Sequence, residues 1–236
     1  MDRLEKIYNS MLNKTFKYAS PVKRIITTPN CKVHKYINDE ALNILLFNNL
    51  NDIHNFFSKY YIDLMDGSVW ADQDFRSSSH LYNPYTKKGL YGRNSAMEVT
   101  KIYYNDAITY YKNNKINKSI FYLGATLHII QDMTVPHHAS VDLLKKHKKL
   151  ESYIRKTYLS NIPNYENLSP HIFSKIAHYI DYNGKKSLEI YSDALELHEE
   201  GKHLHISNNI LPLAKRSTAG CMIKFYNDVK HQYNTN

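Results

Sequence analysis

The sequence predicts an all-α fold in a single domain, and three observations support this prediction. The 236 residues include only seven Gly and seven Pro, which is few for a turn-rich β protein. Apolar residues recur at helical spacing along most of the chain. No alternating strand pattern longer than four residues is present, and no internal repeat is evident.

In the first half of the chain, residues 1–20 have the apolar spacing of an amphipathic helix. An irregular segment with two prolines follows at 21–33, and helices are then predicted at 33–50 and 52–65. A loop is predicted from residue 66 to about residue 95, because glycine, Asn-Pro and Lys-Gly turn signals fall there. A loop of this length in a compact domain is usually functional or disordered.

In the second half, apolar residues at helical spacing return, and their pattern is strongest at 117–134. Pro136 is expected to end that helix because proline lacks a backbone N–H group. The last helix is expected to be interrupted or started by Pro212. The helices predicted in this half cover residues 95–112, 117–134, 141–160, 170–195 and 206–231.

The formal net charge of +9 has two interpretations. A solvated basic surface is the commoner one, and attraction to nucleic acid or to lipid phosphate is the other. The Lys and Arg residues are spread along the chain without a long basic block, so specific recognition of nucleic acid is not expected. We expect a monomer.

The two cysteines, Cys31 and Cys221, are too few for a disulfide framework, and one long-range bridge or two free thiols are both compatible with them. The first 30 residues lack the apolar run of a signal peptide, and no segment is long enough to span a membrane. The sequence therefore predicts either a cytoplasmic protein or an exported one whose leader was removed before this numbering begins.

Histidines and carboxylates in the middle of the chain predict a metal centre. His128 and Asp132 are four residues apart in a predicted helix, so they project from one face about one turn apart. Their neighbours are apolar, and a buried His and Asp need partners, which a metal would supply. For this pair alone, a hydrogen bond within the helix is the alternative.

Two further candidate ligands follow this pair. Pro136 turns the chain, which can return His138 to the same cavity and leave the adjacent His137 unused. His147 and Glu151 repeat the four-residue spacing on the next predicted helix, although the lysines around His147 are also compatible with a solvated basic face. Imidazole with carboxylate is a donor set suited to zinc.

Weaker candidates flank this region. His34 opens an early predicted helix, and His80 and Asp72 lie in the predicted loop. Asp66 and Asp74 compete with Asp72 for the same role. Each of these residues is a weak candidate when it is considered alone.

The segment from Phe121 to His138, Phe-Tyr-Leu-Gly-Ala-Thr-Leu-His-Ile-Ile-Gln-Asp-Met-Thr-Val-Pro-His-His, resembles the zinc-dependent bacterial phospholipases C. This family includes the phosphatidylcholine-preferring enzyme of Bacillus and the catalytic domain of clostridial alpha-toxin. Its pattern is Phe-Tyr-Leu-Gly followed by His-x3-Asp-x5-His, with a proline two residues before the last His, which selects His138 over His137. Shorter similar segments follow the family's order over roughly residues 33–230. They are Val33-His34, Gly67 to Asp72, His80 to Pro84, His147-x3-Glu151 and Ser217 to Gly220.

The resemblance implies an all-helical fold of the phospholipase C and P1 nuclease type, with two to three zinc ions in one cleft. It selects Asp72 over its competitors and places this residue beside the first ion. The ligands that it implies are His80, His128 and Asp132 for one ion, His138, His147 and Glu151 for a second, and His34 with the shared Asp132 for a third.

The third ion is completed in the family by the amine and carbonyl of an N-terminal tryptophan. This chain departs from the pattern, because its only tryptophan is Trp70 and 33 residues precede His34. Cys31, water or a new N-terminus made by cleavage could complete the site, and Cys31 could also be a small buried residue without a ligand role. Residues 1–32 are interpreted as a variable extension, and no C-terminal lipid-binding domain is expected.

These features together predict a zinc-dependent hydrolase of phospholipids at a membrane surface. The expected products from a phosphatidylcholine-like lipid are diacylglycerol and a phosphorylated head group, with Asp72 orienting or deprotonating the attacking water. A P1-type zinc-dependent nuclease is one alternative, although its last carboxylate is usually Asp rather than a residue such as Glu151. A non-catalytic zinc-binding relative is the other alternative. The resemblance implies that the protein is exported. The lack of a signal-peptide pattern in this sequence is also compatible with a cytoplasmic location.

Overall fold

The computed structural model describes residues 31–73, 79–89, 95–141, 145–160, 165 and 168–230. Within these ranges the chain is helical apart from turns, and the only β-type pairing is an isolated bridge between Asn83 and Lys88. The all-α prediction is confirmed, while the helix predicted over 1–20 lies outside the described residues. The helices are α2 (Lys32–Phe47), α3 (Asn51–Lys59), α4 (Tyr61–Ala71), α5 (Ala96–Lys112), α6 (Ile116–Asp132), α7 (Pro136–Ser140), α8 (Lys145–Thr157), α9 (Ile176–Asp193) and α10 (Glu199–Lys230).

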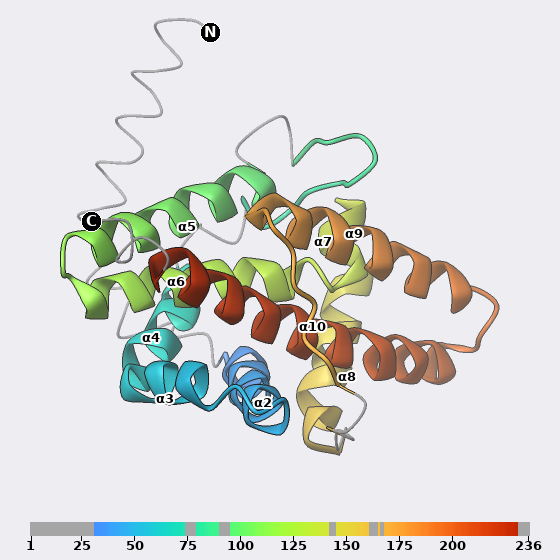
Figure 1. Cartoon of the computed structure of the whole chain (residues 1–236). Coiled ribbons are helices and arrows are strands. Elements are labelled where there is room, and N and C mark those ends of the chain that lie inside the picture. The colour runs from blue at the N-terminus through green and yellow to red at the C-terminus, as the bar shows by residue number, and fades with distance from the viewer. Residues whose placement is uncertain are drawn as a thin grey trace, which may run out of the picture.

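Helix α6 packs against α4, α5 and α10, and in Figure 1 it lies between α5 above it and α4 below it. Every residue from Leu123 to Asp132 is buried, including the polar residues Thr126, His128, Gln131 and Asp132. The main hydrophobic core surrounds α6, and a smaller cluster joins α2, α8 and α10 through Ile37, Ile154 and Ile210. None of the described helices is long and apolar enough to cross a membrane.

Helices α4 and α6 approach each other closely at two glycines. A Cβ atom added at Gly67 would lie 1.8 Å from the carbonyl oxygen of Phe121, and one added at Gly124 would lie 2.1 Å from that of Leu64. Only glycine allows such contact between two backbones. The hydroxyl of Ser68 donates a hydrogen bond of 3.0 Å to the carbonyl of Gly124 across the same contact.

The loop that the sequence predicts to begin at residue 66 begins only after Ala71, and this contact between α4 and α6 is the reason. Helix α4 continues through Gly67 to Ala71, and Asp72 follows as its C-terminal cap residue. Glycine disfavours helix in isolation, so the sequence pattern suggests a loop. Packing against α6 outweighs that preference and extends the helix to the residue before Asp72.

The structure differs in detail from the predictions for Pro136, for the helix at 52–65 and for Pro212. Helix α6 ends at Asp132, and Pro136 begins the short helix α7, where its missing N–H group costs nothing. The helix predicted at 52–65 is divided at Tyr60 into α3 and α4. Helix α10 runs through Pro212, so the prediction that this proline starts or interrupts the last helix is wrong. The buried Ile210 and Ala214 on either side of Pro212 supply packing that offsets the lost hydrogen bond.

Helix α2 is joined to α10 by a buried ion pair. The ammonium of Lys215, which is fully buried, lies 3.2 Å from a carboxylate oxygen of Glu40. The hydroxyl of Tyr165 donates a 2.8 Å hydrogen bond to the other oxygen of Glu40. Removing one partner of such a pair leaves a buried charge, so the pair fixes how α2 lies on α10.

The contact between α4 and α6 makes a testable prediction. Gly67→Ala should lower the free energy of unfolding by about 3 kcal/mol or more, because the two helices must separate to admit the methyl group. The matched control is Gly201→Ala in α10, where a Cβ would meet only the movable side chain of His198. The control should change stability by no more than about 1 kcal/mol. Equal stabilities of the two variants in urea denaturation would contradict the prediction.

Candidate metal centre

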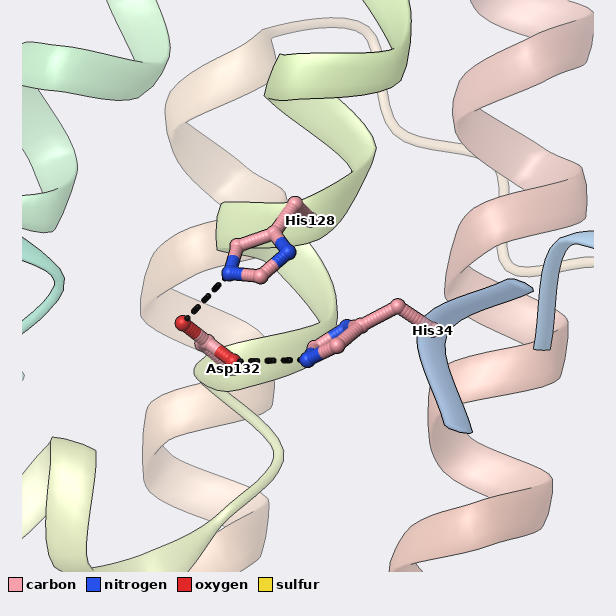
Figure 2. A group of neighbouring side chains, drawn as sticks. All are labelled: His34, His128 and Asp132. Atoms are coloured by element: carbon pink, nitrogen blue, oxygen red, sulfur yellow. Dashed lines mark ion pairs between the residues drawn. The ribbon is translucent and has the colours of Figure 1, made fainter. Parts of the chain in front are cut away.

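Four imidazoles surround the carboxylate of Asp132, the last residue of α6. His80 Nδ1 lies 2.7 Å from Oδ2 of Asp132, and His128 Nε2 lies 3.2 Å from the same oxygen. His34 Nε2 lies 3.5 Å from Oδ1, and His138 Nδ1 lies 3.9 Å from Oδ2. Figure 2 shows His34 reaching Asp132 from α2, while His128 reaches it from one turn earlier on α6.

Different parts of the chain bring these side chains together. His34 lies in the first turn of α2, and His138 lies in α7 just after Pro136. The segment that carries His80 is held against α7 by hydrogen bonds. The backbone N–H of Tyr82 donates to the carbonyl of His138 at 3.0 Å, and Nδ1 of His138 lies 3.2 Å from the carbonyl of His80.

The donor atoms fall into two groups that could each hold a metal ion. Their ligand atoms lie within 4.8 Å of one another in each group, and His128 belongs to both. The groups are His34, His128 and Asp132, and Asp72, His80 and His128. The resemblance assigned these residues differently, with His34 and Asp132 on one ion and His80, His128 and Asp132 on another. The division of ligands among ions therefore stays a prediction.

The histidines have the polar atoms that a cation would satisfy. His128 is 1% exposed; its Nε2 lies 3.2 Å from Asp132 without the geometry of a hydrogen bond, and its Nδ1 has no hydrogen-bond partner among the described residues. Nε2 of the fully buried His80 is in the same situation. Buried polar atoms of this kind are costly unless they are paired. Neutral imidazoles and carboxylates at these separations fit zinc, which prefers nitrogen and oxygen or sulfur donors.

The charges of the site also favour a bound cation. Burial and the neighbouring Asp132 raise the pKa of Asp72. Burial and the proximity of His128 lower the pKa of His34, which keeps this imidazole neutral and able to bind metal. Burial alone would raise the pKa of Asp132, but His128 and His138 outweigh it and hold that pKa well below its usual range. A divalent cation would relieve the repulsion between the carboxylates.

A cavity of about 200 Å³ opens onto this cluster. Glu151 of α8 lines it, and burial together with Asp132 raises the pKa of this carboxyl group to about 7. Arg155, one turn later on α8, lines the same cavity. The apolar part of the lining is formed by Val33, Ile37, Val135, Ile154, Ile210, Leu211 and Ala214.

Most of the predicted site residues therefore gather at one place. The two adjacent histidines of α7 point to different places: His138 lies beside Asp132, whereas the ring of His137 makes a T-shaped contact with the ring of Tyr191. His147 belongs to α8, but its side chain lies outside the described residues. The set of His138, His147 and Glu151 as ligands of a second ion stays a prediction.

The two cysteines have different surroundings, and neither forms a disulfide. Cys221 is fully buried in the core on α10. Cys31 precedes α2 and lines the cavity, and its thiol lies 3.6 Å from Oδ2 of Asp72. Burial and Asp72 raise the pKa of Cys31 to about 12, so the thiol keeps its proton when no cation is bound.

The sequence patterns did not identify Gln131, which supports the cluster. Its side-chain oxygen lies 2.8 Å from Nδ1 of His34, and its amide donates to Asn38 at 2.8 Å and to Thr218 at 3.1 Å. These contacts orient the His34 ring so that Nε2 faces Asp132, in the way that a hydrogen bond to the other ring nitrogen commonly orients a metal-binding histidine. The only sequence signal for this role is that Gln131 directly precedes Asp132.

The raised pKa of Glu151 predicts how the metal-free protein responds to pH. The carboxyl titrates near 4.5 when unfolded and near 7 when folded, so stability falls as pH rises between these values. Glu151→Gln removes this loss. With a chelator present, the variant should exceed the wild type by about 1–2 kcal/mol at pH 8 after allowance for solvent screening. The two proteins should have similar stability at pH 4.5. Stability is measured by urea denaturation at both pH values. The same difference in stability between the two proteins at pH 4.5 and at pH 8 would contradict this prediction.

The fold is similar to that of two clostridial toxins. Alpha toxin from Clostridium absonum gives a TM-score of 0.71 at 18% identity, over 85% of this chain and 64% of that chain. The alpha-toxin of Clostridium perfringens from avian strain SWCP gives a TM-score of 0.66 at 18% identity, over 84% and 64% of the two chains. This likeness shows the fold, and the chain covers less than two thirds of the length of either toxin.

The comparison with curated proteins finds no match. The family of zinc-dependent phospholipases C, in contrast, matches residues 33–212. The matched range contains all the histidines and carboxylates described above, and it covers most of the chain. The chain therefore belongs to the zinc-dependent phospholipase C family.

Proposed function

We propose that the protein hydrolyses phospholipids of the phosphatidylcholine type to diacylglycerol and a phosphorylated head group. The family implies a lipid substrate and a hydrolytic reaction. The observation that supports this proposal best is the mixed lining of the cavity, which combines His34, Asp72, Asp132 and Glu151 with aliphatic side chains. A phosphodiester with an apolar neighbour suits such a cavity better than a nucleic acid does.

The protein's own residues suggest how the substrate is held. Its phosphate would lie toward the cluster, with the glycerol end against Ile37, Ile154 and Leu211. Arg155 lines the same cavity, and a guanidinium can bind two phosphate oxygens at once. Zinc ions bound by the cluster would neutralise charge on the phosphoryl group and make water more acidic.

We assign the role of general base to Asp72. Its carboxylate follows the last turn of α4 and lies beside His80 and His128. Because burial and Asp132 raise its pKa, this carboxylate is more basic than an exposed one and can accept a proton from the attacking water. Its position at a helix end, packed through Gly67, keeps the acceptor fixed during the reaction.

The proposal is tested by assaying the purified, zinc-loaded protein on phosphatidylcholine vesicles and on single-stranded DNA in parallel. We expect release of diacylglycerol and phosphocholine, no DNA cleavage, and loss of activity in a chelator. Asp132→Asn serves as the inactive control, because it removes the carboxylate that all four imidazoles approach. DNA cleavage without lipid hydrolysis would indicate a nuclease instead. Full zinc content with neither activity would indicate a non-catalytic zinc-binding relative.

Replacing the proposed base makes a separate prediction. Asp72→Asn should reduce kcat for phosphatidylcholine by roughly 10²- to 10⁴-fold, because the amide cannot accept the proton. Zinc content is measured in parallel, because Asp72 also belongs to the group with His80 and His128 that could hold an ion, and a loss of zinc would indicate a ligand role instead. The matched control is Asp66→Asn, an exposed position on the same helix, which should keep full activity. Unchanged kcat in Asp72→Asn would exclude this role.

A further inference from the structure

Helix α9 carries none of the candidate metal ligands, yet it contacts the segment of residues 79–89 that carries His80. The carboxylate of Asp181 on α9 accepts two hydrogen bonds from this segment. One, of 2.9 Å, comes from the hydroxyl of Tyr82, and the other, of 2.7 Å, comes from the ammonium of Lys87. Both bonds reach the same oxygen, Oδ1. A single side chain of α9 therefore joins two points of the His80 segment.

The two bonds differ in how well they are shielded from water. Tyr82 is 3% exposed, whereas the side chain of Lys87 is 54% exposed. An exposed ion pair contributes little, because water screens it and two long side chains must be held in one geometry. A buried hydroxyl that loses its partner is costly. The bond from Tyr82 to Asp181 is therefore the stronger of the two attachments.

A second contact with α9 lies one turn from Asp181. A Cβ atom added at Gly184 would lie 3.3 Å from Cγ of Pro84 and 2.9 Å from Cε of Met133. Pro84 belongs to the His80 segment, and Met133 directly follows the last residue of α6. Residues three apart lie on the same face of a helix, so Asp181 and Gly184 present one surface. This surface of α9 supports the His80 segment and the end of α6 together.

The contacts of Tyr82 continue to the metal cluster. Its backbone N–H donates a 3.0 Å hydrogen bond to the carbonyl of His138, and Nδ1 of His138 lies 3.2 Å from the carbonyl of His80. Nδ1 of His80 lies 2.7 Å from Oδ2 of Asp132. Tyr82 is thus held to α9 by its side chain and to α7 by its backbone, two residues from His80. A shift of Tyr82 would move His80 relative to Asp132.

We propose that Asp181 is a positioning residue for the metal centre, and that it acts through Tyr82 to hold His80 at the cluster. A ligand that is held in place before the metal arrives binds it more tightly, because less freedom is lost on binding. The inference depends on metal binding by the cluster and not on which ester the protein hydrolyses.

The test is a double-mutant cycle on zinc affinity, measured by competition with a chromophoric chelator. Asp181→Ala and Tyr82→Phe each remove the bond between hydroxyl and carboxylate. Each should weaken the affected zinc site about 10-fold, the lower end of the range for partners of metal ligands. The double variant should lose no more than either single variant, because both changes break the same bond. Asp181→Asn should stay within about threefold of the wild type, since its amide oxygen can still accept from Tyr82.

The matched control is Glu189→Ala, which removes another exposed ion pair of α9, the one with Lys186. Its zinc affinity should equal that of the wild type. Amide hydrogen exchange of the metal-free proteins gives a second readout, in which the N–H of Tyr82 should exchange faster in Asp181→Ala than in the control. A merely structural role of Asp181 would lower stability towards urea without changing the zinc affinity of the folded protein. Far-ultraviolet circular dichroism confirms that each variant is folded.

Failure of this inference and failure of the proposed function can be told apart, because none of these measurements contains lipid. Unchanged zinc affinity in Asp181→Ala would overturn the assignment. Losses from Asp181→Ala and Tyr82→Phe that add in the double variant would also overturn it, since Asp181 would then not act through Tyr82. A protein that follows the expected cycle but does not hydrolyse phospholipid would retain the assignment and overturn only the proposed function.

Discussion

The site depends on a single buried charge, the carboxylate of Asp132 at the end of the central helix. A buried carboxylate is costly unless it is paired, and Asp132 is paired with imidazoles from four parts of the chain. Helix α2, helix α6, helix α7 and the His80 segment must therefore all approach one point. The packing of these elements and the chemistry of the site are parts of the same arrangement.

The positions of these elements are fixed by contacts that are themselves buried. Gly67 and Gly124 let α4 lie directly on α6, which brings the end of α4, and with it Asp72, to the cluster. On the opposite side, Gln131 joins His34 to Asn38 and Thr218, and so links α2, α6 and α10. Side chains held in this way keep their geometry without a metal, which reduces the cost of organising the site when one binds.

The electrostatic state of the site follows from its burial. Two carboxyl groups near Asp132, those of Asp72 and Glu151, have raised pKa values because burial and like charge disfavour their ionised forms. The pKa of His34 is lowered for the corresponding reason. A divalent cation would favour the ionised forms of these carboxyl groups and would bind the neutral imidazoles beside them. The aliphatic side chains that also line the cavity would suit the lipid part of the proposed substrate.

The sequence by itself determined the all-α class, the strongest helix and the central histidine and carboxylate motif. These features depend on spacing along one helix, where residues four apart must share a face. The choice of Asp72, His80 and His34 needed the family resemblance, because each is isolated in the sequence. Tertiary structure alone decided that α4 passes through Gly67, that α10 passes through Pro212 and that Gln131 supports His34. Each of these features depends on contacts between segments far apart in the chain, and local propensity either opposes such contacts or is indifferent to them. The place of Cys31 beside Asp72, 41 residues away in the sequence, was decided in the same way.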